Sequence, residues 1–173
     1  MEKTVALLSL FILVVACQQK QEPSGQYQST VGSKASLADV SNLQEVLKRD
    51  PKNVGAWIEL GNIFMDSDRF SEAVDSYQKA LDLDPKNVNV RVDMGTCYRN
   101  IGKPNKAVEE YKKALQINPD HLNAHKNLGI VLAFDLKERA EAIKELEKYL
   151  ELAPNAPDAE KAKQIVQQIR SAK

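Results

Sequence analysis

Apolar, small and polar positions recur along most of the chain with a period of about 34 residues. The segment YQKALDLDPKN at residues 77–87 returns as YKKALQINPDH at 111–121, and more loosely as LQEVLKRDPKN at 43–53 and LEKYLELAPNA at 146–156. The four segments start 34, 34 and 35 residues apart. Because a fixed spacing of this size is a property of a repeated structural unit, the sequence predicts a repeat architecture.

Each period divides into two helical patterns. The first half places apolar or small residues at i, i+3, i+4 and i+7, which is one stripe of an amphipathic helix. The second half places Ala, a large residue and a small residue at i, i+4 and i+7, and a Pro then prevents a continuous helix. In chain order the positions are Trp57, Leu60, Gly61, Phe64, Ala73, Tyr77, Ala80 and Pro85; Arg91, Met94, Gly95, Tyr98, Ala107, Tyr111, Ala114 and Pro119; and His125, Leu128, Gly129, Leu132, Ala142, Leu146, Tyr149 and Pro154. We expect paired helices near 54–67 and 70–83, 88–101 and 104–117, and 122–135 and 138–152.

This eight-position pattern resembles the tetratricopeptide repeat (TPR) family, whose unit is a helix–turn–helix of 34 residues. The resemblance covers residues 54–156 and implies an all-α TPR solenoid. Its three helix–turn–helix repeats are expected at 54–87, 88–121 and 122–156. Residues 37–53 match the second helix of a repeat whose first helix is missing, and so predict an extra N-terminal helix. Residues 157–173 carry one apolar stripe with polar residues elsewhere, which suits a C-terminal capping helix.

Two repeats depart from the pattern. Repeat 2 has Arg91 where the first large residue belongs, and Pro104 at the start of its second helix, a position that tolerates Pro. Repeat 3 carries one extra residue and lacks the turn Gly. We therefore expect its inter-helix turn, around residues 135–138, to differ from the other two.

The N-terminus is a different kind of sequence. Residues 1–16 predict a signal peptide, because Lys3 is followed by an apolar run from Val5 to Ala16. Twelve residues span about 18 Å as a helix, short of the roughly 30 Å hydrocarbon core of a membrane. The run ends in VVAC, which resembles the lipobox of bacterial lipoproteins and implies lipidation of Cys17; an ordinary secretory signal is the alternative. Residues 17–36, rich in Gln and Ser, predict a disordered tether.

The resemblance to lipoproteins also implies a location. It places the protein in the bacterial cell envelope, attached to a membrane through its N-terminal lipid. The residues after Cys17 are Gln18 and Gln19, and not the Asp that retains such lipoproteins in the inner membrane of some bacteria. The outer membrane, with the protein on its periplasmic face, is therefore the favoured location over the inner membrane.

Composition and motifs indicate a binding protein and not an enzyme. The 24 basic and 24 acidic side chains cancel, so no net charge favours nucleic acid. His121 and His125 are four residues apart, but Leu122 stands where a zinc-protease motif needs Glu. His125 and Cys97 are expected to be packing residues. No phosphate-binding loop, dinucleotide turn or nucleophile elbow occurs, so we expect no catalytic site, cofactor, metal or small-molecule substrate.

The TPR resemblance implies that a peptide or a partner helix binds in a concave groove lined by the first helices. The groove positions are Ile58, Glu59, Asn62, Asp66, Val92, Asp93, Thr96, Arg99, Lys126, Asn127, Ile130 and Phe134. The carboxylate clamp that some TPR proteins use needs Lys where this chain has Ile58, so a mixed amphipathic segment is the expected ligand. Asn62 and Asn127 are candidates to hold a peptide backbone, since an amide both donates and accepts.

Two functions remain open at this stage. The first is a membrane-tethered protein-interaction scaffold for assembly of a cell-envelope complex. The alternative is a non-catalytic accessory subunit of a periplasmic enzyme system, of the cytochrome-maturation or cell-wall-hydrolysis type. The sequence identifies neither the protein partner nor the process.

Overall fold

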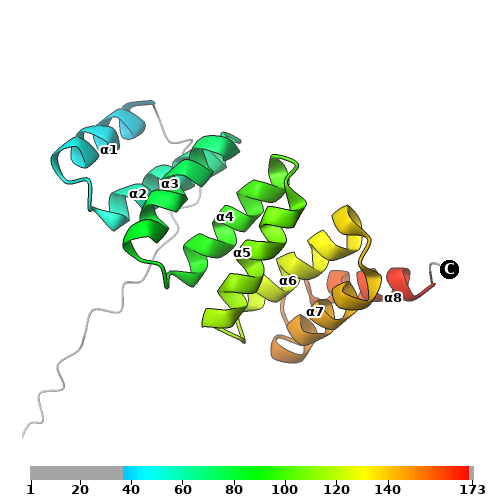
Figure 1. Cartoon of the computed structure of the whole chain (residues 1–173). Coiled ribbons are helices and arrows are strands. Elements are labelled where there is room, and N and C mark those ends of the chain that lie inside the picture. Colours follow the sequence, from blue (N-terminus) through cyan, green and yellow to red (C-terminus); the bar gives the residue numbers. More distant parts are fainter. Residues whose placement is uncertain (1–36, 172–173) are drawn as a thin grey trace, which may run out of the picture. The chain divides into compact units, whose positions relative to one another are not determined.

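The computed structural model describes residues 37–171, and all regular elements within them are helical (Figure 1). In chain order the elements are α1 (Leu37–Arg49), α2 (Val54–Asp66), α3 (Phe70–Leu83), α4 (Val88–Asn100), α5 (Pro104–Ile117), α6 (Leu122–Val131), the π-helical turn η1 (Leu132–Leu136), α7 (Arg139–Leu152) and α8 (Ala159–Ser171). The all-α solenoid predicted from the repeat is confirmed. The expected signal peptide, Cys17 and the tether lie outside the described residues.

The helices stack in chain order from α1 to α8 (Figure 1). Helices α2 and α3, α4 and α5, and α6 and α7 pack as pairs, and successive pairs meet through α3 with α4 and α5 with α6. At the two ends, α1 packs on α2 and α8 packs on α7. None of the helices within residues 37–171 has the length and apolar character needed to cross a membrane.

A side chain caps the start of each first helix. Asn53, Asn87 and His121 have extended backbone and accept a hydrogen bond from the amide three residues later, at 2.9, 3.2 and 3.2 Å. Such caps satisfy one of the backbone N–H groups that a helix start leaves without a partner. The second helices begin without a side-chain cap, and α5 begins with Pro104, as expected.

Within each pair, a glycine of the first helix lies directly against the large residue of the second. The three contacts are Gly61 with Tyr77, Gly95 with Tyr111 and Gly129 with Leu146. A Cβ atom added to these glycines would lie 2.5, 2.7 and 2.7 Å from the facing side chain. The absence of a Cβ therefore allows the two helices to approach closely, and the facing large residues are at most 1% exposed.

The turn between the paired helices contains one residue with left-handed backbone in each repeat. Repeat 3 differs in the number of residues spanned by the hydrogen bond that closes the turn. The closing residues, which have left-handed backbone, are Asp68, Gly102 and Lys137. In repeat 2 the next amide, that of Lys103, donates to the carbonyl of Tyr98, five residues earlier, at 2.9 Å. In repeat 3 the amide of Glu138 donates to Leu132, six residues earlier, at 2.8 Å. The extra residue of repeat 3 is therefore accommodated in η1, at the end of the first helix, while Lys137 replaces the missing turn Gly.

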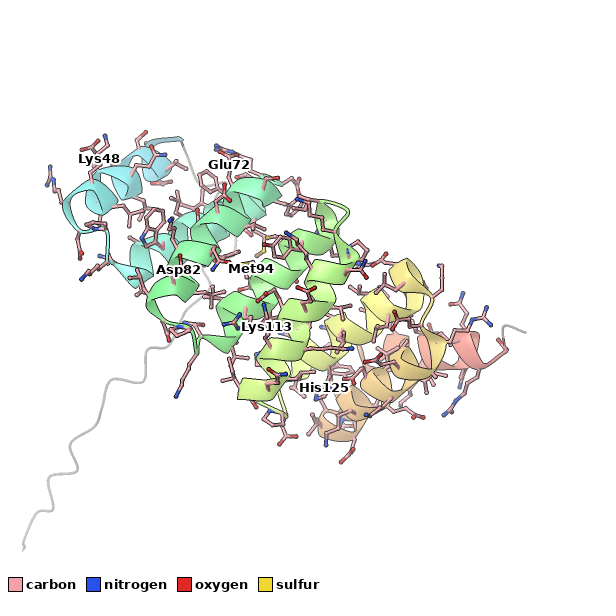
Figure 2. All side chains as sticks on the ribbon, viewed as in Figure 1. Lys48, Glu72, Asp82, Met94, Lys113 and His125 are labelled. Atoms are coloured by element: carbon pink, nitrogen blue, oxygen red, sulfur yellow. The ribbon has the colours of Figure 1, made fainter. Side chains whose placement is uncertain are left out.

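The end helices cover the first and last repeats. Val40 and Leu47 of α1 are buried against the core that contains Leu60 and Phe64. Ala162 and Val166 of α8 are buried against repeat 3, as the apolar stripe predicted. Figure 2 shows Lys48 on the outer side of α1 and Met94, which is 1% exposed, enclosed between helices.

Candidate functional site

The first helices carry most of the predicted groove, and a repeated hydrogen bond fixes each of them to the turn before it. Its donors and acceptors are Trp57 Nε1 and the Pro51 carbonyl at 2.9 Å, Arg91 Nη2 and the Pro85 carbonyl at 2.8 Å, and His125 Nε2 and the Pro119 carbonyl at 2.8 Å. Three different side chains thus make the same contact at the same repeat position. Each has an N–H that reaches a carbonyl six residues earlier.

The unusual residues at this position have partners on the second helix of the same repeat. Arg91 Nη1 donates to the Glu110 carboxylate at 2.8 Å, and His125 Nδ1 lies 2.6 Å from the Glu145 carboxylate. Both pairs are nearly enclosed, with side chains 8–13% exposed. His125 is 7% exposed, which confirms it as a packing residue (Figure 2). The departure at Arg91 is therefore matched by a buried carboxylate on the facing helix.

Two groove candidates bind the buried tyrosines. The Asn62 side-chain oxygen accepts a hydrogen bond from the Tyr77 hydroxyl at 2.7 Å. Thr96 donates to the Val92 carbonyl at 3.1 Å, so the Tyr111 hydroxyl, 3.1 Å away, donates to Thr96. These polar side chains therefore satisfy the core, and the oxygen of Asn62 is already engaged.

The same position in repeat 3 has no polar group to satisfy. Ile130 faces Leu146 there, and the two side chains pack in one apolar cluster. Each first helix thus matches the side chain that lies opposite it, with a polar residue facing a tyrosine and an apolar residue facing Leu146.

Other predicted groove residues are engaged or buried. Val92 is 3% exposed and packs in the core with Tyr111, so its inclusion among the groove residues is wrong. The side chain of Val92 packs against α5, the paired helix, and not against solvent. Arg99 Nε donates to Asp135 at 2.6 Å, and Lys126 Nζ donates to Asp158 at 2.7 Å. Both cations therefore join α4 or α6 to a later segment of the chain.

Asp158 fastens the start of α8 to repeat 3. It accepts hydrogen bonds from Lys126 and from the Tyr149 hydroxyl. These two donors, Lys126 first, hold the pKa of Asp158 below its ordinary value. Because α8 follows directly, this junction sets where the last helix lies against α6 and α7.

The N-terminal part of the predicted groove is acidic. The side chains of Glu59, Asp66 and Asp93 make no hydrogen bond or ion pair within the part of the chain that the structure describes. Burial, and after it the nearby Asp66 carboxylate, raises the pKa of Asp93 to about 6. No cation within residues 37–171 offsets these charges by pairing, so this end of the groove favours a positively charged group.

Three predicted residues meet α8 around an open hollow of about 500 Å³. Arg99, Ile130 and Phe134 line it from α4, α6 and η1. From α8 it is lined by Lys161, Gln164, Ile165 and Gln168. Phe134 is 40% exposed, a large apolar side chain facing solvent.

A smaller hollow of about 190 Å³ lies beside the first. It is lined by Ile130, Lys161 and Ile165 of the first hollow, together with Lys126, Leu146, Asp158 and Ala162. The two hollows therefore share an apolar wall between α6 and α8. Together they place exposed apolar surface at the C-terminal end of the predicted groove.

The α8 residues were missed by the sequence analysis, which treated the outer face of this helix as solvated. One signal was available. Ile165 lies outside the stripe of Ala159, Ala162, Val166 and Ile169, so a second apolar contact for this helix could have been inferred.

Nothing in the described residues suggests reaction chemistry. No group of three or more His, Cys, Asp or Glu side chains within residues 37–171 could hold a metal ion. Cys97 is fully buried and unpaired, and burial raises the pKa of its thiol to about 12. A thiol that stays protonated is a poor nucleophile, so Cys97 serves as a small apolar packing residue.

Solved structures with the same fold are TPR proteins. MamA is 25% identical, with a TM-score of 0.70 over 75% of this chain and 74% of its own. The first TPR of Spaghetti (RPAP3), solved bound to the HSP90 peptide SRMEEVD, is 28% identical, with a TM-score of 0.63 over 70% of this chain and 97% of its own. The Arabidopsis OM64 TPR domain is 20% identical, with a TM-score of 0.64 over 69% of this chain and 96% of its own, and shows the fold alone.

TPR proteins of this kind are typically protein-interaction scaffolds and are generally not catalytic. A search of curated proteins gave no match. A scan against protein families matched residues 32–165 to the cytochrome c-type biogenesis protein H TPR domain. The matched range covers most of the chain and all three repeats, so the chain belongs to the family of the cytochrome c-type biogenesis protein H TPR domain.

Proposed function

We propose that this protein is a non-catalytic scaffold that binds a peptide segment or a partner helix in the groove formed by α2, α4 and α6 and closed at one end by α8. The single observation that supports this most is the exposed apolar hollow around Phe134. Three apolar side chains, Ile130, Phe134 and Ile165, meet in this one hollow with polar groups around them, which is the usual composition of a ligand-binding pocket. The RPAP3 neighbour, which is solved with a bound peptide, supports the same mode of action.

The binding function is tested by capture from detergent-solubilised membranes with the purified protein as bait. Replacing Ile130 and Phe134 by Ala should abolish recovery of the partner and leave the helical circular dichroism unchanged. The matched control is Lys79→Ala, an exposed position on α3. Equal recovery by the double variant and the parent would place the binding surface outside this groove.

We further propose that the process served is maturation of c-type cytochromes, with this chain as an accessory subunit. The family match supports this process over the other envelope roles that the sequence left open. The captured partners should then be c-type cytochrome precursors or other proteins of their maturation. Deletion of the gene should lower covalently bound haem in c-type cytochromes and leave b-type cytochromes unchanged. Recovery of a secretin or a barrel-insertion complex would instead favour a role in envelope assembly.

Attachment to a membrane through lipid on Cys17 is the remaining part of the proposed function. It is supported by the apolar run that ends in VVAC and by the polar segment after it. Mass spectrometry should find a mature chain that begins at Cys17 and carries fatty acid. Cys17→Ala should move the protein from the detergent phase to the aqueous phase. An unmodified mature chain with another N-terminus would contradict the anchor, and fractionation of the membranes tests the favoured outer-membrane location.

A further inference from the structure

The end of the first helix in repeat 3 is built differently from the other two repeats. Its turn hydrogen bond, from Glu138 to Leu132, spans six residues, where that from Lys103 to Tyr98 in repeat 2 spans five. The extra residue forms the π-helical turn η1. Such turns are uncommon and are frequently found at functional sites. The one irregular turn of the described repeats thus lies beside the hollow at the C-terminal end of the groove.

The irregular turn directs two side chains toward the groove. Asp135 accepts a hydrogen bond from Arg99 at 2.6 Å, which fastens η1 to α4. Phe134, the residue before it, lines the 500 Å³ hollow and is 40% exposed. Both residues lie in the segment that contains the insertion. The π-helical turn therefore carries both the aromatic side chain and the contact that holds the turn in place.

The wall opposite η1 offers unoccupied polar groups around an apolar centre. Ile165 of α8 and Ile130 of α6 are half-buried in the same hollow. The side chains of Lys161, Gln164 and Gln168 line it and make no hydrogen bond or ion pair with other residues of the described chain. Its volume lies within the range of about 300–1,000 Å³ that is typical of ligand pockets. The hollow can therefore bury an apolar side chain and pair an acidic group at its edge.

The two ends of the groove differ in charge. At the C-terminal end Arg99 and Lys126 pair with Asp135 and Asp158, so that among the described residues lining the two hollows Lys161 is the cation without an ion pair. At the other end the three acidic side chains described above are unpaired. Charge complementarity of this kind fixes the direction in which a partner binds. A partner should place its acidic end at α8 and its basic end at α2.

We propose that the hollow formed by η1, α6 and α8 is the anchor subsite for the partner segment. It binds one large apolar side chain between Phe134, Ile130 and Ile165. An acidic residue one helical turn away in the partner pairs with Lys161, and a basic residue further along approaches Asp66 and Asp93. This inference rests on the proposed peptide-binding function and adds the class and direction of the ligand.

The test uses a phage-displayed library of 12-residue peptides, selected on the full-length protein in detergent. Selected peptides should share a Phe, Trp or Leu with Asp or Glu three or four residues away. Binding of the best peptide is then measured by fluorescence polarisation. Phe134→Ala and Lys161→Glu should each weaken it at least tenfold. A peptide whose acidic residue is changed to Lys should recover its affinity for the Lys161→Glu variant.

Lys163→Glu is the matched control, because Lys163 is exposed on the same helix and lines neither hollow. Deletion of Ala133, which restores the 34-residue period, should also weaken binding. Lys161→Glu keeps the test valid if that deletion disturbs the fold. Peptides that bind the Phe134→Ala and Lys161→Glu variants as tightly as the parent would overturn the anchor and leave groove binding intact. Selection of no peptide at all would contradict both proposals.

Discussion

Replacing Asp93 by Asn should stabilise the protein at neutral pH. Asp93 is mostly buried, and its carboxylate makes no hydrogen bond or ion pair within residues 37–171. Burial, with a smaller contribution from Asp66, raises its pKa from 3.8 to about 6. The folded protein therefore prefers the protonated acid, and ionising it at neutral pH costs free energy that the unfolded chain does not lose.

The size and the pH range of the effect follow from the raised pKa. A rise from 3.8 to about 6 corresponds to about 3 kcal/mol, since a tenfold change in proton affinity is about 1.4 kcal/mol. Because the folded-state pKa is the higher one, the penalty disappears as the pH falls below 3.8, and it is nearly complete once the pH exceeds 6. Asp93→Asn should therefore raise the free energy of unfolding by about 0.5 kcal/mol at pH 4 and by about 3 kcal/mol above pH 7.

Urea denaturation of the parent and the variant between pH 4 and pH 8 measures this difference directly. Asp75→Asn, an exposed site on α3, controls for the loss of one negative charge. Asp66→Asn removes the second cause of the shift and should lower the pKa of Asp93, which can be followed by NMR. A stability difference for Asp93→Asn that is the same at pH 4 and pH 8 would refute the reasoning.

Three further predictions concern the fold. Gly95→Ala should lower the free energy of unfolding by about 1–3 kcal/mol in urea melts, because its Cβ would lie 2.7 Å from a buried ring, whereas Gly55→Ala near the start of α2 should be neutral or stabilising by up to about 1 kcal/mol. Arg91→Trp alone should cost about 3–5 kcal/mol by leaving Glu110 without its main partner, and adding Glu110→Ser, which reproduces the pair found in repeat 1, should recover part of that loss. Since the pKa of Asp158 is lowered in the folded state, its stabilising effect is present above about pH 4 and is lost as the pH falls below that value; hydrogen exchange in α8 should increase there in the parent and not change further in Asp158→Asn.

The sequence predicted the repeated part of the fold closely because the same residue pattern occurs in all three repeats. Helices α3 and α5 begin and end at the predicted residues 70–83 and 104–117, and the other paired helices differ by one residue or by the π turn. Each helix has its own apolar stripe, and each pair is followed by a Pro. Local pattern and tertiary packing therefore indicate the same boundaries.

The groove residues were harder to predict because the neighbouring helices decide which face of a helix is buried and which is exposed. Val92 is four residues before Thr96 on the same face of α4, yet Val92 is buried in the apolar cluster that contains Tyr111 while Thr96 stays partly exposed. Lys126 has the charge expected of a ligand contact, and the structure uses it to hold Asp158. Such pairings join residues 32 positions apart, a separation over which no helical periodicity gives information.

The position of α8 connects the fold to the direction of binding. Its buried stripe closes the solenoid, while its Lys161 and Ile165 meet Phe134 across the hollow. At the opposite end, Asp93 remains in a buried site that disfavours its charge, and a partner's Lys or Arg there would stabilise the ionised form. Below pH 6 the free protein holds Asp93 mostly protonated, so binding of such a partner must release that proton, and affinity should fall as the pH is lowered from 7 to 5. In Asp93→Asn this pH dependence should disappear, whereas Lys161→Glu should weaken binding and keep the pH dependence. A selected peptide with a basic end whose affinity is the same at pH 5 and pH 7 would show that Asp93 does not face the ligand.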